Sequence, residues 1–306
     1  MENKPLVYLN GDFIPWEQAT VHIMSHSVGR GSAIFEVLSF HETVTGPAVF
    51  RLDKHVTRFF RSAELLEMDL PLTEGELYEA VRDTVRRTGL VEGFIKIIGF
   101  YPQISFEILP PSEPLSVVIF AFDPNRNPTQ ANARIAEGSS ACISQWHKLD
   151  PCSVPIEAKV AANYLNGMMA RLEARSRGFD YAVLLDSKGY VAEGGTESVL
   201  LVKNGTIFTP ALGTVLDSIT RKSLLQAARA NGIETVEEMI TPEFLHDADE
   251  IFLGGTLYRV RPISRLEDRI IEGTPGPVTR RVSAMMETIA RGRDERFREW
   301  LFPVGK

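Results

Sequence analysis

Strand-like and helix-like segments are mixed along this chain of 306 residues, without the regular alternation that a doubly wound parallel sheet requires. Apolar, β-rich runs predict strands in the first half, at residues 6–9, 33–40, 49–52, 94–100 and 115–122. Asp53 is the expected N-cap of one helix, and Thr73-Glu74-Gly75-Glu76 is a capping box that predicts another, ending at Gly89. No Gly-x-Gly-x-x-Gly follows a strand and opens a helix, and no Walker motif is present. The pattern therefore favours an α+β fold over a nucleotide-binding sheet.

A polar segment with two prolines, Asp123-Pro124-Asn125-Arg126-Asn127-Pro128, follows one of these strands and is the best candidate for a domain boundary. We expect a small N-terminal α+β domain at 1–122, an interdomain loop at 123–131 and a larger C-terminal α/β domain at 132–306. The chain length agrees with about two domains. In the second half, helices are expected from about 160 to 177, from 218 to 231 and from about 277 to 290.

The charge balance of 33 basic and 40 acidic side chains gives a net charge of −7, which disfavours nucleic acid or an anionic membrane surface as the main partner. The longest apolar run, 117–122, is far shorter than the ~20 residues of a membrane span. Two cysteines, Cys142 and Cys152, fit a reducing compartment, and the first residues show no apolar signal segment. We therefore expect a cytoplasmic enzyme that binds neither nucleic acid nor a membrane.

Lys159 lies in a small, mostly apolar context, Glu157-Ala158-Lys159-Val160-Ala161-Ala162, with Tyr164 five residues further on. Burial lowers the pKa of a lysine, and an amine that loses its proton can form a Schiff base. The same pattern is also typical of a lysine on the exposed start of a helix. The pattern alone leaves both interpretations open.

Two further segments combine flexible backbone with polar side chains. Glu193-Gly194-Gly195-Thr196-Glu197-Ser198 lies between two expected strands, where adjacent glycines allow a sharp turn and a close approach to a ligand. Residues 213–221 offer N–H groups and hydroxyls at a helix start, which suit an anion. A hairpin turn and ordinary helix capping are the alternatives. His22 and His26 are four residues apart, but no third ligand is nearby in the sequence, so we expect no metal site.

Taken together and in order, these segments resemble the class IV, fold-type IV aminotransferases that use pyridoxal 5′-phosphate (PLP), and the branched-chain amino acid aminotransferases most of all. The resemblance covers nearly the whole chain. It is carried by segments at residues 9–11, 25–26, 31–36, 50–59, 158–164, 185–190, 192–197, 219–221, 248–252, 255–256 and 276–279. It implies a two-domain fold of the kind found in D-amino-acid aminotransferase, with the cofactor between the domains. It also implies a homodimer in which loops of one subunit complete the pocket of the other.

The resemblance assigns catalytic roles to three residues. It implies that Lys159 bonds covalently to PLP and, once displaced by an amino acid, moves the proton between Cα and the cofactor. Glu193 matches the carboxylate that faces the pyridine nitrogen and keeps it protonated, so that the ring can accept electrons. Tyr164 matches the tyrosine that hydrogen-bonds the phenolic oxygen of the cofactor.

The remaining cofactor contacts implied by the resemblance concern the phosphate. Arg58 matches the arginine that binds it. Ile219 and Thr220 match N–H and hydroxyl donors at a helix start, and Thr256 matches a further donor.

Substrate residues depart from the branched-chain pattern, which has tyrosine, glycine and arginine where this chain has Arg30, Val37 and Lys96. Lysine keeps the charge of arginine but loses its bidentate geometry. Arg30 could hold a substrate carboxylate or form a salt bridge with Glu36 or Asp123. The full set of expected substrate contacts is Arg30, Phe35, Val37, Lys96, Thr256 and Leu257.

The resemblance therefore implies PLP-dependent transamination between an amino acid and a 2-oxo acid, with branched-chain amino acids as the leading substrates. A D-amino-acid aminotransferase is the alternative with the same chemistry. Aminodeoxychorismate lyase is an alternative of another class, which shares Lys159, Glu193 and Arg58 but eliminates pyruvate. A protein that only stores PLP is a third possibility, but it would not need a carboxylate at the ring nitrogen.

Overall fold

A computed structural model describes residues 6–123 and 138–305 of the chain. From residue 124 onward, the expected interdomain loop at 123–131 lies outside the described residues. The described residues divide into two compact units. Unit 1 contains residues 6–123, 158–162 and 288–305, and unit 2 contains residues 138–157 and 163–287.

Two segments that the sequence-based division placed in the C-terminal domain are grouped with unit 1. Residues 158–162 join it because Val160 forms a β-bridge with Ile34. Residues 288–305 join it because the strand β16 (Leu301–Pro303) pairs with β4 (Gly46–Phe50). Both contacts link positions that are far apart in the chain, so no local sequence pattern predicts them.

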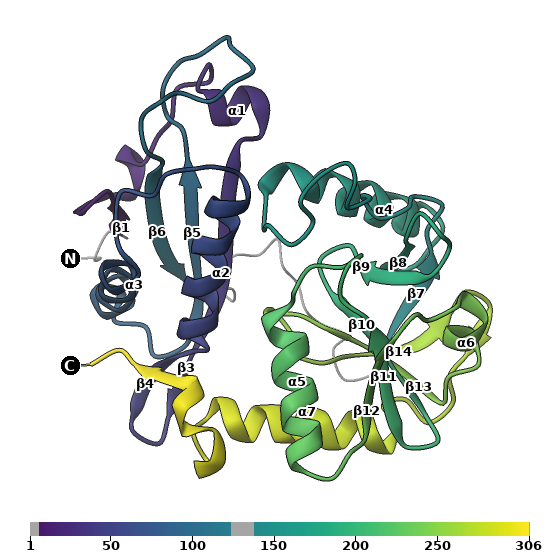
Figure 1. The fold of residues 1–306 in the computed structure, drawn as a ribbon. Helices are drawn as coiled ribbons and strands as arrows, with labels where there is room; N and C mark the ends of the chain where they lie inside the picture. Colours follow the sequence, from purple (N-terminus) through teal and green to yellow (C-terminus); the bar gives the residue numbers. More distant parts are fainter. Residues whose placement is uncertain (1–5, 124–137, 306) are drawn as a thin grey trace. The chain divides into compact units, whose positions relative to one another are not determined.

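Unit 1 is built on an antiparallel sheet, which has seven strands among the described residues (Figure 1). In order across the sheet the strands are β16, β4, β3 (Ala33–Thr43), β5 (Gly93–Phe100), β6 (Ser116–Phe122), β1 (Leu6–Leu9) and β2 (Asp12–Pro15). The strand prediction for the first half is therefore confirmed, except that 49–52 is split between the end of β4 and the start of a helix.

The helices of unit 1 are α1 (His26–Arg30), α2 (Leu52–Leu65) and α3 (Glu74–Thr88), with short 3-10 turns η1 (Trp16–Gln18) and η4 (Glu295–Trp300). Apolar side chains of α2 and α3, including Phe59 and Val81, share one core with β3 and β5. The predicted capping box of α3 is confirmed, with Gly89 as its left-handed C-cap.

The prediction that Asp53 caps α2 is wrong. The helix starts one residue earlier, and Arg51, at φ 54°, occupies the N-cap position. Asp53 instead lies in the first turn, 3.6 Å from Arg51 Nε. A carboxylate there still stabilises the helix, because the first turn carries the positive end of the helix dipole.

Unit 2 contains a mixed sheet, which has nine strands among the described residues. Its main path runs through β12 (Thr235–Glu238), β11 (Thr206–Pro210), β10 (Ser198–Lys203), β13 (Glu250–Gly254), β14 (Arg261–Leu266), β7 (Ser139–Ile143), β8 (Tyr181–Leu185) and β9 (Val191–Gly194), and β15 (Arg269–Ile270) pairs with β14. Ser198 of β10 also pairs with Glu193 of β9. This pairing closes the path from β10 to β9 into a ring and brings the turn after Glu193 onto its rim.

The helices of unit 2 are α4 (Tyr164–Ser176), α5 (Ile219–Ala230), α6 (Pro242–His246) and α7 (Pro277–Ala290), whose residues up to 287 belong to this unit. The predictions for α5 and α7 are confirmed. The helix expected from about 160 begins only at Tyr164, after the 3-10 turn η3 (Ala161–Asn163), because Val160 is occupied by its bridge to Ile34. No helix in the described part of the chain is long and apolar enough to cross a membrane.

Candidate active site

Lys159 lies on an extended segment of unit 1 beside β3, not on the exposed start of a helix. The backbone N–H of Phe35 donates to the carbonyl of Lys159 at 3.0 Å. The N–H of Lys159 in turn donates to Ser62 Oγ of α2, also at 3.0 Å. The Lys159 backbone is thus held on two sides, so the root of its side chain is fixed.

The aromatic ring of Phe35 lies close to two lysine side chains. Lys159 Nζ is 4.8 Å from the ring centroid and Lys96 Nζ is 5.3 Å from it. Val37 is paired with Lys96 across β3 and β5, which places both on the same face as Phe35. Burial lowers the pKa of Lys96, and the charge of Lys159 lowers it further. Of the expected substrate residues, Phe35, Val37 and Lys96 therefore gather on one face with Lys159.

A buried carboxylate orients Arg58 of α2. Glu36 is fully buried and accepts hydrogen bonds from Arg58 Nε at 2.7 Å and Nη2 at 2.8 Å. His55 Nδ1 lies 2.6 Å from the same carboxylate. Burial alone would raise the pKa of Glu36, but the charges and hydrogen bonds of Arg58 and His55 outweigh it and lower that pKa to about 2. This bidentate contact fixes the plane of the Arg58 guanidinium.

Glu193 of unit 2 is held through both carboxylate oxygens. Its Oε1 forms an ion pair with Lys148 Nζ, and its Oε2 accepts the backbone N–H of Leu216 at 3.1 Å. The second glutamate of this turn, Glu197, has different partners: its carboxylate accepts hydrogen bonds from Thr196 and from Arg171. Glu197 therefore braces the turn, whereas Glu193 ties the turn to the segment that leads into α5.

The start of α5 offers donors for an anion. Ser218 caps the helix by accepting the N–H of Arg221 at 3.2 Å, and Ile219 and Thr220 occupy the first two helical positions. The Arg221 side chain is buried and donates to Thr209 and to the carbonyl of Pro210. This contact locks the first turn onto the sheet. The backbone N–H groups of the first turn of α5 and the hydroxyl of Thr220 are hydrogen-bond donors of the kind that bind a phosphate group.

Thr256 and Leu257 follow β13 in a turn closed by N–H groups of Tyr258 and Arg259, which donate to the carbonyl of Gly255. Thr256 is partly buried and Leu257 is exposed. Both belong to unit 2.

Tyr164 is the first residue of α4, a helix that packs tightly against the turn after Glu193. A Cβ at Gly167 would lie 2.1 Å from the carbonyl oxygen of Gly195, so only glycine permits this approach. Tyr164 and Glu193 consequently come from directly neighbouring elements of unit 2.

Arg30 ends α1 and is exposed. Its Nη2 donates to the carbonyl of Phe106 at 2.9 Å and its Nε to that of Glu107 at 3.3 Å. These contacts take the place of the salt bridge to Glu36 that was considered from the sequence, since Glu36 is bound by His55 and Arg58. The side chain of Arg30 therefore binds the backbone of the loop that follows β5.

Sequence reasoning missed the roles of two residues that organise the site. Glu36 was considered only as a partner of Arg30, and Lys148 was not considered as a partner of Glu193. Glu36 shares its face of β3 with Ile34 and Leu38, which are fully buried. A glutamate in that position needs a cationic partner, so the two-residue period of the strand could have indicated it. No comparable local signal exists for Lys148.

Comparisons with known proteins identify the family of this chain. The family model described as amino-transferase class IV matches residues 33–266. The branched-chain-amino-acid aminotransferase of Salmonella typhimurium is 33% identical over 300 residues, which cover 97% of each chain. The enzyme of the same name from Escherichia coli K12 is 32% identical over 302 residues, covering 98% of this chain and 97% of the relative.

Solved structures show the same likeness. A branched-chain amino acid aminotransferase from Thermobaculum terrenum, in its PLP-form, has a TM-score of 0.91 and 30% identity, covering 100% of each chain. The Escherichia coli branched-chain enzyme has a TM-score of 0.94 and 32% identity, covering 99% of this chain and 100% of the other. The predicted two-domain fold of fold-type IV is therefore confirmed. With one family model matching most of its length and relatives aligned from end to end, the chain belongs to the class IV aminotransferases.

Proposed function

We propose that this protein is a PLP-dependent aminotransferase that moves an amino group between branched-chain amino acids and 2-oxo acids. The family match over residues 33–266 carries the proposal. Relatives and solved structures that are about a third identical over almost the whole chain are branched-chain aminotransferases, and one of those structures is a PLP-form.

The donor set described above fits PLP. When bound, the cofactor supplies an electron sink for the charge that develops at the amino acid Cα. Lys159 is proposed to bind the cofactor covalently and to move the Cα proton with its amine. Glu193 is proposed to accept a hydrogen bond from the pyridine nitrogen, and Tyr164 to donate one to the phenolic oxygen.

The phosphate is proposed to bind Arg58, the leading amides of Ile219 and Thr220, and the Thr256 hydroxyl. Arg58 is supported in this role by Glu36, because a guanidinium held in one plane loses little entropy when it binds a second anion. The α5 start is supported by the anchoring of Arg221.

Substrate side chains are proposed to contact the face formed by Phe35, Val37 and Lys96, together with Thr256 and Leu257. Phe35 and Val37 offer apolar surface, which suits a branched aliphatic group. Lys96 carries a charge beside them and is proposed to hold the distal carboxylate of a dicarboxylic substrate such as glutamate. Arg30 is proposed to act on the substrate carboxylate directly or through the loop whose carbonyls it holds.

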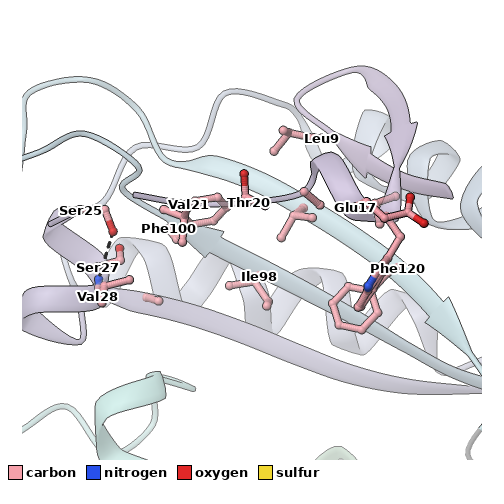
Figure 2. Close-up of a pocket in the computed structure, with 15 residues that line it drawn as sticks. Leu9, Glu17, Thr20, Val21, Ser25, Ser27, Val28, Ile98, Phe100 and Phe120 are labelled. Carbon is pink, nitrogen blue, oxygen red and sulfur yellow. Dashed lines mark hydrogen bonds between the residues drawn. The ribbon is translucent and has the colours of Figure 1, made fainter. Parts of the chain in front are cut away.

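The protein is also proposed to form a homodimer. An apolar hollow of about 620 Å³ in unit 1 is lined by residues that include Leu9, Val28, Ile98 and Phe120 (Figure 2). Other large apolar side chains of unit 1 are exposed, among them Ile23, Phe106, Ile108 and Leu109. Large apolar side chains that are exposed on a folded unit, next to an apolar hollow, are what a protein interface would cover. Light scattering should give the mass of a dimer, and the mass of a single chain would contradict this proposal.

A reducing, cytoplasmic location is proposed as well. The chain has two cysteines, Cys142, which is buried, and Cys152, which is exposed, and they are not bonded to each other. So few cysteines, which form no disulfide framework, are typical of a compartment that keeps thiols reduced.

The central experiment loads the protein with PLP and follows its absorbance while L- and D-amino acids are added one at a time. L-Leucine, L-isoleucine, L-valine and L-glutamate should convert the cofactor to its amine form without any added acceptor. Conversion by D-amino acids alone would favour the D-specific alternative. Release of pyruvate from aminodeoxychorismate would favour the lyase, and no conversion by any substrate would favour a protein that only stores PLP.

The attachment site has its own test. Borohydride reduction followed by peptide mapping should find the cofactor on Lys159. The Lys159→Ala variant should lose both the trapped adduct and transamination, whereas Lys203→Ala, which changes an ion-paired surface lysine, should keep both. An adduct on another lysine, such as Lys148, would show that the assignment of Lys159 is wrong.

A further inference from the structure

We infer that Lys148 is a positioning residue, which holds the Glu193 carboxylate in the orientation that contacts the pyridine nitrogen of the cofactor. The inference rests on the proposed function, because it requires Glu193 to face that nitrogen. It adds a residue that acts through Glu193 and does not touch the substrate.

The geometry of the ion pair carries the first step. Lys148 Nζ contacts Oε1 of Glu193, while the N–H of Leu216 contacts Oε2. Both side chains are largely buried, with 13% and 14% of their surface exposed. Two donors on different oxygens fix the rotation of the carboxylate, and removal of one of them leaves a single anchor. Each carboxylate oxygen can still accept another hydrogen bond, so the pair does not block the ring nitrogen.

Lys148 is itself held by the end of β8. Its backbone N–H donates to the carbonyl of Leu185 at 2.7 Å. The preceding residue is held twice: His147 Nδ1 lies 2.8 Å from the carbonyl of Asp186, and Asn166 donates to the carbonyl of His147 at 2.8 Å. The lysine therefore starts from a rigid backbone position.

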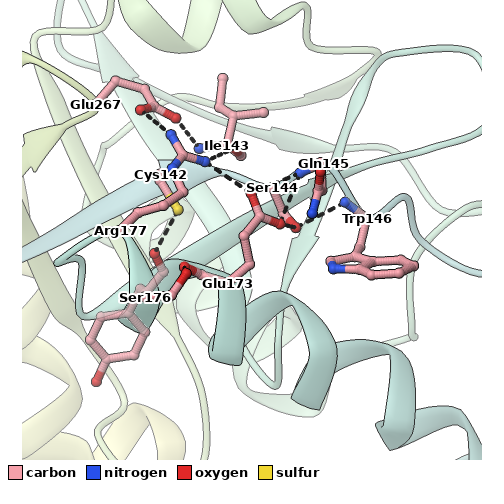
Figure 3. Close-up of polar contacts among 10 residues, drawn as sticks. Cys142, Ile143, Ser144, Gln145, Trp146, Glu173, Ser176, Arg177 and Glu267 are labelled. Carbon is pink, nitrogen blue, oxygen red and sulfur yellow. Dashed lines mark hydrogen bonds and ion pairs between the residues drawn. The ribbon is translucent and has the colours of Figure 1, made fainter.

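A second network of hydrogen bonds and ion pairs fixes the segment that leads from the end of β7 to Lys148 (Figure 3). Glu173 of α4 accepts hydrogen bonds from Ser144 Oγ at 2.7 Å and from the N–H of Gln145. Arg177 joins Glu173 to Glu267, and Glu267 also accepts the N–H of Ile143 at 2.7 Å. Backbone of residues 143–148 is thus bound to α4, β8 and the turn after β14. Such a support is what a site needs to hold a polar contact within a fraction of an ångström.

The ammonium group has two opposing effects on the ring nitrogen. Its charge partly offsets that of Glu193, which disfavours a protonated ring. Its contact with Oε1 keeps the carboxylate aimed at the ring, which favours protonation through a charge-assisted hydrogen bond. Orientation dominates in our inference, because a carboxylate with one anchor can rotate away from the nitrogen altogether.

The test compares Lys148→Met, which keeps the apolar stem and removes the charge, with Lys148→Arg, which restores a cation. Protein loaded with ¹⁵N-labelled PLP reports the protonation of the ring nitrogen by its NMR chemical shift. In Lys148→Met that shift should move toward the value of the unprotonated ring, and kcat should fall about tenfold or more while KM for the amino acid stays within about twofold. Lys148→Arg should recover both readouts to within about threefold of the wild type.

Two further variants keep the inference falsifiable. Lys148→Gln retains a hydrogen-bond donor and should fall between the wild type and Lys148→Met, which also covers the case in which the methionine variant does not fold. Lys203→Met removes a lysine of unit 2 that pairs with aspartates on a different edge, and it should leave both readouts unchanged.

The outcomes separate the inference from the proposed function. A wild-type ring shift and kcat in folded Lys148→Met, together with a changed shift in Glu193→Gln, would overturn the role of Lys148 and leave that of Glu193 intact. A shift toward a more protonated ring in Lys148→Met would also overturn it, because the charge effect would then dominate. An unchanged shift in Glu193→Gln would refute the role of Glu193 itself.

Discussion

Replacement of Glu36 by glutamine should destabilise unit 1 and remove part of its sensitivity to acid. Glu36 is fully buried, and its pKa is lowered from 4.5 to about 2 by Arg58 and His55 against the effect of burial. A difference of this size between the unfolded and folded states corresponds to about 3 kcal/mol of stability. Because the folded pKa is the lower one, this contribution is complete above pH 4.5 and is lost as the pH falls toward about 2.

The assay is urea unfolding of the cofactor-free chain, followed by the fluorescence of Trp300. This tryptophan is buried in unit 1 and lies under the guanidinium of Arg51, 4.4 Å from its ring. The chain has three tryptophans, so replacement of Trp16 and Trp146 by phenylalanine leaves Trp300 as the only one that reports on unfolding. At pH 7 the free energy of unfolding of Glu36→Gln should be about 3 kcal/mol below that of the same background with Glu36. This difference in the free energy of unfolding between the two proteins should become steadily smaller between pH 4.5 and pH 3.

A matched control lies on the same helix. Glu64 pairs with Arg61 on the surface of α2, with 70% of its side chain exposed, so Glu64→Gln should cost less than about 1 kcal/mol at any pH. His55 affects both proteins in the same direction: burial lowers its pKa, so stability is lost as the pH falls below 6.5. The reasoning would be refuted if Glu36→Gln lowered the free energy of unfolding by less than about 1 kcal/mol at pH 7, or if the difference did not change between pH 7 and pH 3.

Three further changes test other parts of the molecule. Arg58→Ala should weaken PLP binding roughly ten- to a hundred-fold, measured by equilibrium dialysis, because a charge-assisted contact is lost; equal retention would remove Arg58 from the phosphate. Arg30→Leu should raise KM for every substrate if it serves the α-carboxylate, or for dicarboxylic substrates alone if it serves the distal one. Steady-state kinetics within twofold of wild type for both alanine-like and glutamate-like substrates would leave only its contacts with the carbonyls of Phe106 and Glu107. Thr73→Ala should lower the free energy of unfolding by about 1 kcal/mol through loss of the capping box, and urea curves that coincide with wild type would contradict this.

Local chemistry made much of the secondary structure predictable. The capping box at Thr73 and the left-handed Gly89 involve atoms within a few residues of each other, so the sequence contains the whole interaction. The hairpin between β1 and β2 is of the same kind, since Asn10 and Gly11 adopt the positive φ angles that the turn requires. Membership of the family was also predictable, because the short motifs and their order along the chain can be identified in the sequence without any knowledge of the fold.

Residues of the candidate site were predictable one by one, but not their partners. Lys159, Glu193 and Arg58 could be selected from their motifs, and their roles remain predictions. That Glu36 would bind Arg58, or that Arg30 would hold the carbonyls of Phe106 and Glu107, could not be read from the same motifs.

The sequence by itself determined the capping box and the end of α3, the extent of α5 and α7, most of the strands of unit 1, and which family the order of motifs resembles. Only the tertiary structure decided that residues 158–160 lie beside β3 and that Lys148 reaches Glu193, 45 positions further along the chain. The physical reason is one of range. Caps and turns are formed by neighbours in sequence, whereas a buried ion pair depends on strand register and on the packing of several elements at once.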